Sequence, residues 1–442
     1  MEKGMISVDQ WSEGSQAYFL THLHADHTKG LSSKWNKGPL FCSPITAKLF
    51  PAKFPGFKFS LLRVLEIGSS HTLSLASPST GLEAMVQVTP IDAHHCPGAV
   101  MYLFRGELGC MLYTGDFRWE ATSARAELGK TMLRNALGGD RVDFLYLDNT
   151  YCNPSYSFPP REVVAQQVVD IIASHPDHDI IIGIDTLGKE DLLLHISRAL
   201  RIKIWVWPER LQTMHLLGFH NIFTTKTSLT RVRAVPRYSF SVDTLEGLNT
   251  MRPTIGIMPS GLPWVVRPLE ENCDSIGSSL PIWHHIGSKW RTNGVAHVDR
   301  SQPNEKSSSA QGFHRYIYSV MYSDHSCFGE IQEFIKFVQP SNMRGIVSSS
   351  SCYIDPLYYL GHLRGANQPH LQSGKKFQRR ELDESVDPVQ TKSVLGCSKY
   401  TEAKRKRERS VKVNCLSVHT NRVSVLRRVR RGAKIVEIDG LD

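Results

Sequence analysis

The feature that most constrains this chain is a dense group of metal-ligand side chains near its N-terminus. Three histidines and one aspartate fall within six residues, in the order His22-Leu-His24-Ala-Asp26-His27. They end a short apolar run that begins at Tyr18 and reads as a buried strand. These side chains can surround metal only where the backbone turns sharply, so we expect a strand end running into a helix start. A surface histidine cluster without metal is the alternative.

Two later segments offer ligands of the same kind. His94-His95-Cys-Pro-Gly98 lies in an expected turn between strands at residues 85–91 and 100–104. Thr114-Gly-Asp116 follows an expected strand at residues 110–113 and adds a carboxylate. Each segment alone reads as an ordinary turn, but their order after the first motif strengthens the case for a metal site. Imidazole combined with carboxylate suits zinc, and also manganese or iron.

The pattern of apolar runs divides the chain of 442 residues into two structural parts and a tail. Up to about residue 150, short strand-like runs favour a sheet sandwich with its site along one edge. From Asn153 onward, strands alternate with helices such as residues 161–173 and 189–200, as in a small α/β unit. A Ser-, Gly-, His- and Lys-rich stretch at 272–311 predicts a long loop or insertion. Thereafter we expect a strand at residues 317–322, a helix at 328–337 and a strand at 345–347.

Most of the excess positive charge lies at the C-terminal end. The net charge is +10, and residues 371–442 hold eighteen Lys and Arg against nine Asp and Glu. This polar, basic composition predicts a disordered tail. The basic runs at 404–407 and 427–431 could be nuclear-import signals or a non-specific DNA-binding arm, or could only solubilise the protein. The rest of the chain is therefore close to neutral, and a DNA-binding groove there would need a local cluster of basic side chains.

The cysteines and the apolar stretches indicate a reducing compartment. The nine cysteines form no CxxC pair, which suits neither a zinc finger nor a disulfide framework. The first residues show no signal-peptide pattern, and no apolar stretch approaches the length of a membrane span. We therefore expect no membrane partner.

Taken in order, the motifs resemble the metal-ligand series of the metallo-β-lactamase superfamily. Wider stretches are similar to its β-CASP DNA nucleases, namely residues 43–47, 92–98, 113–118, 146–150 and 322–326. The resemblance covers about residues 5–360, apart from 272–311. It implies an α/β fold, a metallo-β-lactamase αββα sandwich with an inserted β-CASP α/β domain. The expected divisions are 1–150 and 316–370 for the sandwich, 151–315 for the insertion and 371–442 for the tail.

The same resemblance implies a set of metal ligands. One divalent ion would be held by His22, His24, His95 and Asp116, and a second by Asp26, His27 and the bridging Asp116. We choose His95 rather than His94 because the family's ligand directly precedes Cys-Pro-Gly. Asp9 matches the aspartate that lies behind the ligands and orients them.

The resemblance further assigns residues that close the site from its other side. Asp148 and His325 match the first two β-CASP motifs and, with Asp26 and Asp116, are the expected catalytic residues. His325 would touch the scissile phosphate or protonate the leaving oxygen, and a core histidine is the alternative. The third motif falls near Val347, where DNA-processing members tend to carry valine and RNA-processing members histidine.

Three further side chains are candidates for contact with a substrate phosphate. Lys189 follows a strand and opens a helix, so its side chain and the neighbouring backbone amides could receive a phosphate. Thr150 and Ser323 lie beside the motif residues and could donate to a terminal 5′-phosphate. For Lys189, an ordinary solvated helix start is the alternative.

These observations predict a nuclear, metal-dependent 5′-to-3′ exonuclease that acts on DNA ends. One or two divalent ions are expected, with zinc preferred and manganese or magnesium as alternatives. The resemblance implies repair of crosslinks or breaks, or chromosome-end processing, with DNA-repair or telomere proteins as partners. An RNA-processing endonuclease with the same site and a non-catalytic DNA-repair scaffold stay open as other functions.

Overall fold

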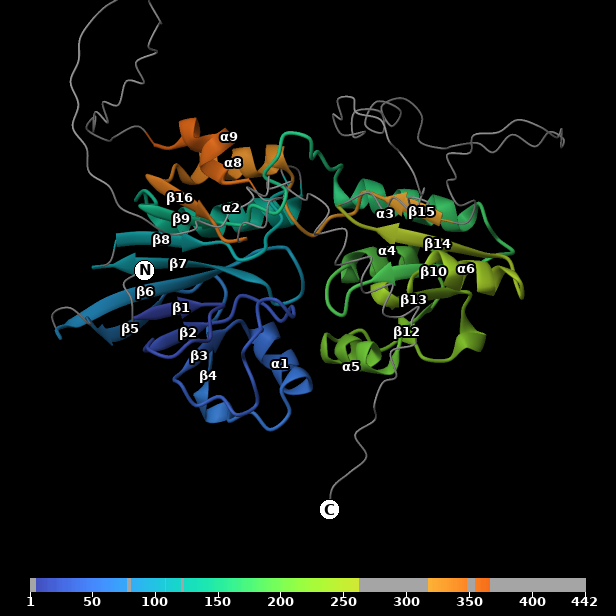
Figure 1. The fold of residues 1–442 in the computed structure, drawn as a ribbon, viewed down its shortest axis with the longest axis horizontal. Helices are drawn as coiled ribbons and strands as arrows, with labels where there is room; N and C mark the ends of the chain where they lie inside the picture. Colours follow the sequence, from blue (N-terminus) through green and yellow to red (C-terminus); the bar gives the residue numbers. More distant parts are fainter. Residues whose placement is uncertain are drawn as a thin grey trace, which may run out of the picture.

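The computed structural model describes residues 5–77, 81–107, 109–120, 123–261, 317–347 and 354–365. These residues form two α/β units that lie side by side (Figure 1). The stretch at 272–311 and the tail at 371–442, with its basic runs, lie outside the described residues. No helix within the described ranges is long and apolar enough to cross a membrane.

The first unit is a sandwich of two β-sheets. One sheet is parallel and has the order β1-β2-β3-β4, and the other has the order β16-β9-β8-β7-β6-β5. In the second sheet, β5 to β8 pair antiparallel, whereas β8, β9 and β16 pair parallel. The strands are β1 (Ile6–Val8), β2 (Ala17–Phe19), β3 (Leu40–Cys42), β4 (Leu62–Val64), β5 (His71–Ala76), β6 (Glu83–Asp92), β7 (Val100–Gly106), β8 (Gly109–Tyr113), β9 (Phe144–Leu147) and β16 (Asn342–Gly345).

Apolar side chains from both sheets form one core between them. Phe19 of β2 lies at the centre, with ring centroids 4.9 Å from Phe41 of β3 and 5.0 Å from Phe104 of β7. Helices cover the outer face of each sheet, because the apolar side chains on that face must be buried as well (Figure 1). They are α1 (Pro44–Lys53), α2 (Ala124–Leu137), α8 (Phe328–Val338) and α9 (Pro356–Leu360). The predicted αββα sandwich is therefore confirmed.

The second unit is a parallel six-stranded sheet with the order β12-β11-β13-β10-β14-β15. Every residue of its central strand β10 is buried, as expected for a sheet with helices on both faces. Its helices are α3 (Arg161–Ala173), α4 (Glu190–Leu200), α5 (Pro208–Leu216) and α6 (Val242–Asn249). Its strands are β10 (Asp179–Ile184), β11 (Ile204–Trp205), β12 (Phe223–Thr224), β13 (Val232–Pro236), β14 (Thr254–Pro259) and β15 (Ile317–Val320).

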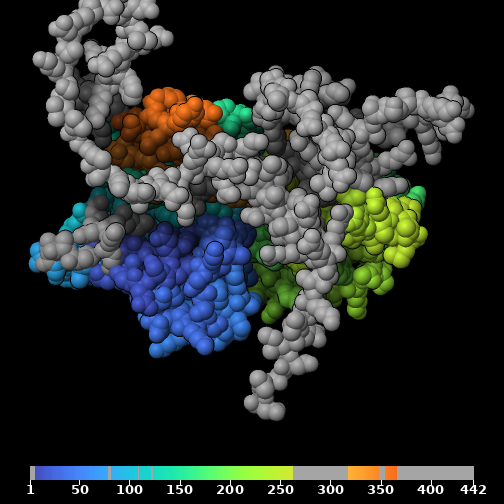
Figure 2. Space-filling view, in the orientation of Figure 1, coloured from blue at the N-terminus to red at the C-terminus, as the bar shows by residue number. Residues whose placement is uncertain are grey.

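The strand directions bring the chemically important loops together. In the mixed sheet, β6, β8, β9 and β16 all run the same way, so their carboxyl ends meet at one edge. The chain leaves that edge after β9, builds the second unit, and returns through α8 to β16. The two units also meet where α1 contacts α5, as the blue and green surfaces of Figure 2 show. The second unit is thus inserted beside the edge that carries the predicted ligands.

Two of the expected elements near the site differ from the structure. No helix begins after His24, because residues 25–30 form turns, with the Thr28 N–H donating to the His24 carbonyl at 3.2 Å. The strand expected at 345–347 lies instead at Asn342–Gly345, where it pairs with β9. The division into domains stays a prediction. Because β15 pairs with β14, we propose to place the end of the inserted unit after Val320 rather than at 315.

Candidate metal centre

The site begins where β1 ends, at the Asp9 carboxylate, which lies behind the histidines that follow β2. Asp9 accepts from the Thr21 N–H at 2.9 Å and from the Thr21 hydroxyl at 2.7 Å. A third contact joins its Oδ2 to Nδ1 of His27 at 2.7 Å. Asp9 adopts a φ of 52°, a left-handed conformation that is uncommon for a residue with a side chain. Asp9 therefore contacts Thr21, just before the histidine motif, and His27 at its end. This is the place predicted for the residue that orients the metal ligands.

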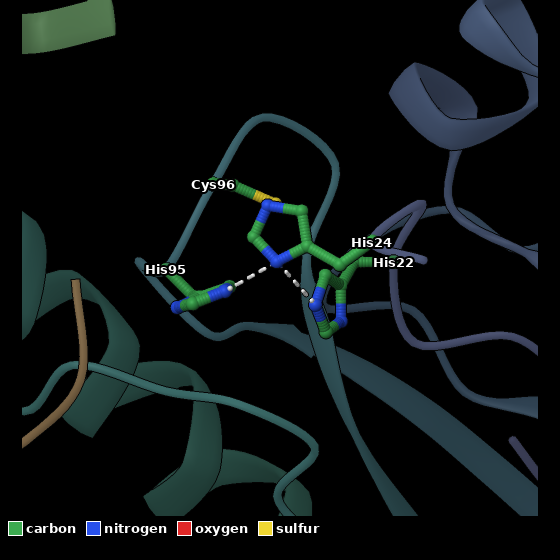
Figure 3. A group of neighbouring side chains, drawn as sticks. All are labelled: His22, His24, His95 and Cys96. Atoms are coloured by element: carbon green, nitrogen blue, oxygen red, sulfur yellow. Dashed lines mark hydrogen bonds between the residues drawn. The ribbon is translucent and has the colours of Figure 1, made fainter. Parts of the chain in front are cut away.

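Three imidazole nitrogens converge in front of Asp9. Nδ1 of His24 lies 3.0 Å from Nε2 of His22 and 3.1 Å from Nε2 of His95, the two contacts drawn in Figure 3. The His22 and His95 side chains are buried. Burial, with smaller effects of neighbouring imidazoles, lowers the pKa of both, to about 3 for His95. Both rings are therefore neutral at physiological pH, the form that binds metal ions.

In each of the three rings, the nitrogen that points away from the other two rings (the outer nitrogen) faces a hydrogen-bond acceptor. In the neutral ring, this acceptor fixes the proton on the outer nitrogen. His24 Nε2 is 2.9 Å from the Leu187 carbonyl, and His95 Nδ1 is 2.9 Å from the Asp324 carbonyl. Since the Thr21 hydroxyl donates to Asp9, it can only accept from Nδ1 of His22, which lies 3.0 Å away.

With each ring neutral and its proton on the outer nitrogen, Nδ1 of His24 presents its lone pair to Nε2 of His22 at 3.0 Å and to Nε2 of His95 at 3.1 Å. No proton is left to join them. A bound cation would remove this repulsion, so the donor set fits a divalent metal ion.

Asp116 enters the same space from the end of β8. Its Oδ2 lies 3.6 Å from Nε2 of His22 and 3.5 Å from Nε2 of His95, and its Oδ1 lies 3.2 Å from Nε2 of His27. Burial alone would raise the Asp116 pKa, but His27 and His325 hold it well below its usual range. Asp116 is thus a buried carboxylate between two groups of ligands, the position that a bridging residue requires.

The second predicted group of ligands is more open to solvent. Asp26 Oδ2 lies 3.7 Å from Nε2 of His27, and the Asp26 side chain is 79% exposed. Burial would lower the pKa of His27, but the carboxylates of Asp116 and Asp9 outweigh it and raise that pKa to about 12. A cation beside His27 must therefore compete with a proton.

The structure distinguishes the two adjacent histidines and adds a cysteine. Among the described residues, the clusters with metal-ligand spacing include His95 but not His94. His94 has a φ of 54°, and its Nε2 lies 3.7 Å from Asp92 instead. The Cys96 sulfur lies within 4.8 Å of the His22, His24 and His95 ligand atoms, which was not predicted (Figure 3). Burial raises the pKa of the Cys96 thiol well above its usual range, so it is neutral.

Asp148 and His325 form a pair on the other side of the site. His325 Nδ1 lies 2.8 Å from Asp148 Oδ2, and His325 Nε2 lies 4.0 Å from Asp116 Oδ2. Burial would lower the pKa of His325, but Asp148 and then Asp116 raise it to about 9. His325 is therefore protonated near neutral pH and can donate from the nitrogen that faces Asp116.

The three candidates for phosphate contact all have partners within the protein. The Thr150 hydroxyl donates to Asp148 at 2.6 Å, and the Ser323 hydroxyl donates to the His325 carbonyl at 2.9 Å. Lys189 is buried, with its Nζ 2.8 Å from Asp324 Oδ2. Their contact with a substrate phosphate stays a prediction.

Arg118 supports this region in a way that the sequence did not predict. It is almost completely buried, lies 2.9 Å from the Glu330 carboxylate, and donates to the Ser323 carbonyl at 2.8 Å. It thereby joins the turn after Asp116 to the loop that carries His325. No local sequence pattern marks Arg118 as buried, because its partner Glu330 lies 212 residues away.

Comparisons with known proteins find one matching family and several similar relatives. Residues 218–351 match the family described as DNA repair metallo-beta-lactamase. The chain is 36% identical to the 5′ exonuclease Apollo of Gallus gallus, over 80% of this chain and 64% of that protein. It is 35% identical to that of Danio rerio, over 80% and 52%. It is 31% identical to the DNA cross-link repair protein SNM1 of Arabidopsis thaliana, over 77% and 62%.

The chain therefore spans between about half and two thirds of the length of these relatives. The family match begins within the second unit and ends beyond His325. On this evidence the chain contains a DNA repair metallo-beta-lactamase region and is similar, over about four fifths of its length, to proteins named as a 5′ exonuclease and a DNA cross-link repair protein.

Proposed function

We propose that this protein is a metal-dependent 5′-to-3′ exonuclease that hydrolyses phosphodiester bonds at DNA ends. The observation that carries the proposal is the convergence of three imidazole lone pairs beside the buried carboxylate of Asp116. The relatives named as a 5′ exonuclease and as a DNA cross-link repair protein support the reaction and the substrate.

The ligand geometry favours two divalent cations that share Asp116. His22, His24, His95 and Asp116 would hold one ion, and Asp26, His27 and Asp116 the other. Such a pair of ions lowers the pKa of a bound water and neutralises charge on the phosphate. We propose zinc, because imidazole and carboxylate suit it, with manganese or magnesium as alternatives.

The other residues orient groups and move protons. Asp9 holds the His27 ring through Nδ1, so that Nε2 faces Asp116. Asp148 holds the His325 ring in the same manner, and its charge stabilises the imidazolium. We propose that His325 Nε2 donates to the scissile phosphate or protonates the leaving oxygen.

DNA is the proposed substrate rather than RNA. The Val347 N–H donates to the Asn149 side chain at 2.9 Å, so the third β-CASP position lies close to the first motif at Asp148. Valine at that position is the pattern of DNA-processing members. We further propose a nuclear protein that acts in crosslink or break repair or at telomeres, with DNA-repair or telomere proteins as partners.

Cleavage of end-labelled oligonucleotides tests the proposal. The purified chain is incubated with zinc, manganese or magnesium and with DNA and RNA of one sequence, each labelled at the 5′ or the 3′ end. We expect metal-dependent release of nucleotides from the 5′ end of DNA, and no release by Asp116→Asn. Preferential cleavage of RNA would support the RNA-processing alternative. Binding of DNA without cleavage under any metal would support the scaffold.

A further inference from the structure

One turn of the inserted unit contacts the metal centre directly. This turn, residues 185–189, lies between β10 and α4. Its Leu187 carbonyl accepts from Nε2 of His24 at 2.9 Å, although the two residues are 163 positions apart. In the neutral ring that bond places the proton on Nε2, and it holds Nδ1 of His24 aimed at His22 and His95.

The next residues of the turn reach a second ligand through an ion pair. Lys189 Nζ lies 2.8 Å from Asp324 Oδ2, and both side chains are more than nine-tenths buried. The Asp324 backbone carbonyl accepts from Nδ1 of His95 at 2.9 Å. His325, the next residue, faces Asp116. The position of Asp324 therefore sets the position of two imidazoles.

The turn itself is held firmly. Gly188 approaches so closely that a Cβ there would lie 3.2 Å from Asp324 Oδ2, and Lys189 has a left-handed φ of 63°. The buried Arg210 donates to the Gly188 carbonyl at 2.8 Å and pairs with Glu190 at 2.7 Å. A non-glycine residue stays in this conformation only when its surroundings fix it, and such residues gather at functional sites.

We propose that Lys189 is a positioning residue of the metal centre. Through its ion pair with Asp324 it fixes His95 and His325, while the turn that carries it fixes His24. The inserted unit thereby orients ligands that belong to the sandwich. This inference rests on the metal centre in the proposed function, and it gives Lys189 a role other than contact with a substrate phosphate.

Cobalt titration of the apo-protein tests this role in the full chain. Co²⁺ is added to metal-free parent, Lys189→Met and Lys189→Arg, and binding is followed by visible absorption. Groups that orient metal ligands typically contribute about 10- to 100-fold in metal affinity, so Lys189→Met should bind Co²⁺ that much more weakly. Lys189→Arg keeps a cation that can reach Asp324 and should restore most of the affinity.

The matched control is Lys336→Met, which removes an exposed lysine that lies 2.8 Å from Glu333 in α8. Its Co²⁺ affinity should equal that of the parent. Circular dichroism shows whether each variant folds. If Lys189→Met does not fold, Asp324→Asn is the milder change, because it keeps an oxygen acceptor for Lys189, and it too should weaken Co²⁺ binding.

Steady-state kinetics at saturating metal separates positioning from substrate contact. A positioning role predicts a lower kcat for Lys189→Met, with an unchanged KM for 5′-phosphorylated DNA. Parent-like Co²⁺ affinity together with a raised KM would show that Lys189 contacts the substrate and would overturn the proposal. Parent-like Co²⁺ affinity together with a parent-like kcat and KM would also overturn the proposal. A parent protein that binds Co²⁺ but cleaves no nucleic acid would refute the nuclease function and leave the Co²⁺ comparison valid.

Discussion

Replacing Gly115 by alanine tests how the turn after β8 delivers Asp116 to the site. Gly115 has a φ of 53°, a left-handed conformation that costs an L-residue about 1–2 kcal/mol. The added Cβ would lie 2.8 Å from Cγ2 of Thr21, well inside an ordinary carbon contact of roughly 3.5–4.0 Å. Overpacking of this kind adds about 1–3 kcal/mol. The free energy of unfolding should therefore fall by about 2–5 kcal/mol.

The matched control for this substitution is Gly138→Ala. Gly138 has a φ of 60°, but a Cβ there would meet only Arg105 Nη1, at 3.8 Å. This variant isolates the backbone conformation and should lose only about 1–2 kcal/mol. Urea denaturation measures both losses, and elemental analysis measures bound metal. Since Asp116 follows Gly115, only Gly115→Ala should also lose metal. Equal losses of stability in the two variants, with metal retained in both, would refute the argument.

Four further outcomes are expected. Asp116→Asn should abolish DNA cleavage while the protein stays folded, and cleavage within a few-fold of the parent would contradict the two-ion assignment. Arg118→Met leaves the Glu330 carboxylate in a largely buried site without its cation, so urea denaturation should show a loss of about 3–5 kcal/mol. If Thr150 and Ser323 contact a terminal phosphate, 5′-phosphorylated ends should be degraded faster than 5′-hydroxyl ends at matched salt. Truncation after Leu371 should leave metal content unchanged but flatten the dependence of log affinity on log salt, by roughly 0.7–0.9 for each lost phosphate contact.

The local elements of the site could be predicted because their signals are local. The helix at Arg161–Ala173 and those beginning near residues 190 and 208 follow a regular spacing of apolar residues. The helix α1 was missed because its apolar residues do not follow one face and it contains Pro51. Its capping pattern could have revealed it, since Pro44 opens the helix and the Ser43 side chain accepts from the Thr46 N–H.

The contacts that complete the site could not be predicted from local patterns. His24 bonds to a carbonyl 163 residues away, and His95 to one 229 residues away. Both acceptors are backbone oxygens, which every residue possesses, so no residue type marks them. The burial of Lys189 was missed for the same reason, because a lysine at a helix start is ordinarily solvated and its partner Asp324 lies beyond the inserted unit. Only the fold identifies these partners.

Anomalous diffraction from crystals of the zinc-loaded protein tests the central claim most directly. Data collected on both sides of the zinc absorption edge locate bound zinc without reference to activity. We predict a strong peak among His22 Nε2, His24 Nδ1, His95 Nε2 and Asp116, with a weaker second peak beside His27 and Asp26. A zinc-loaded crystal without a peak among the three imidazoles, or with zinc bound only elsewhere, would contradict the account of this site.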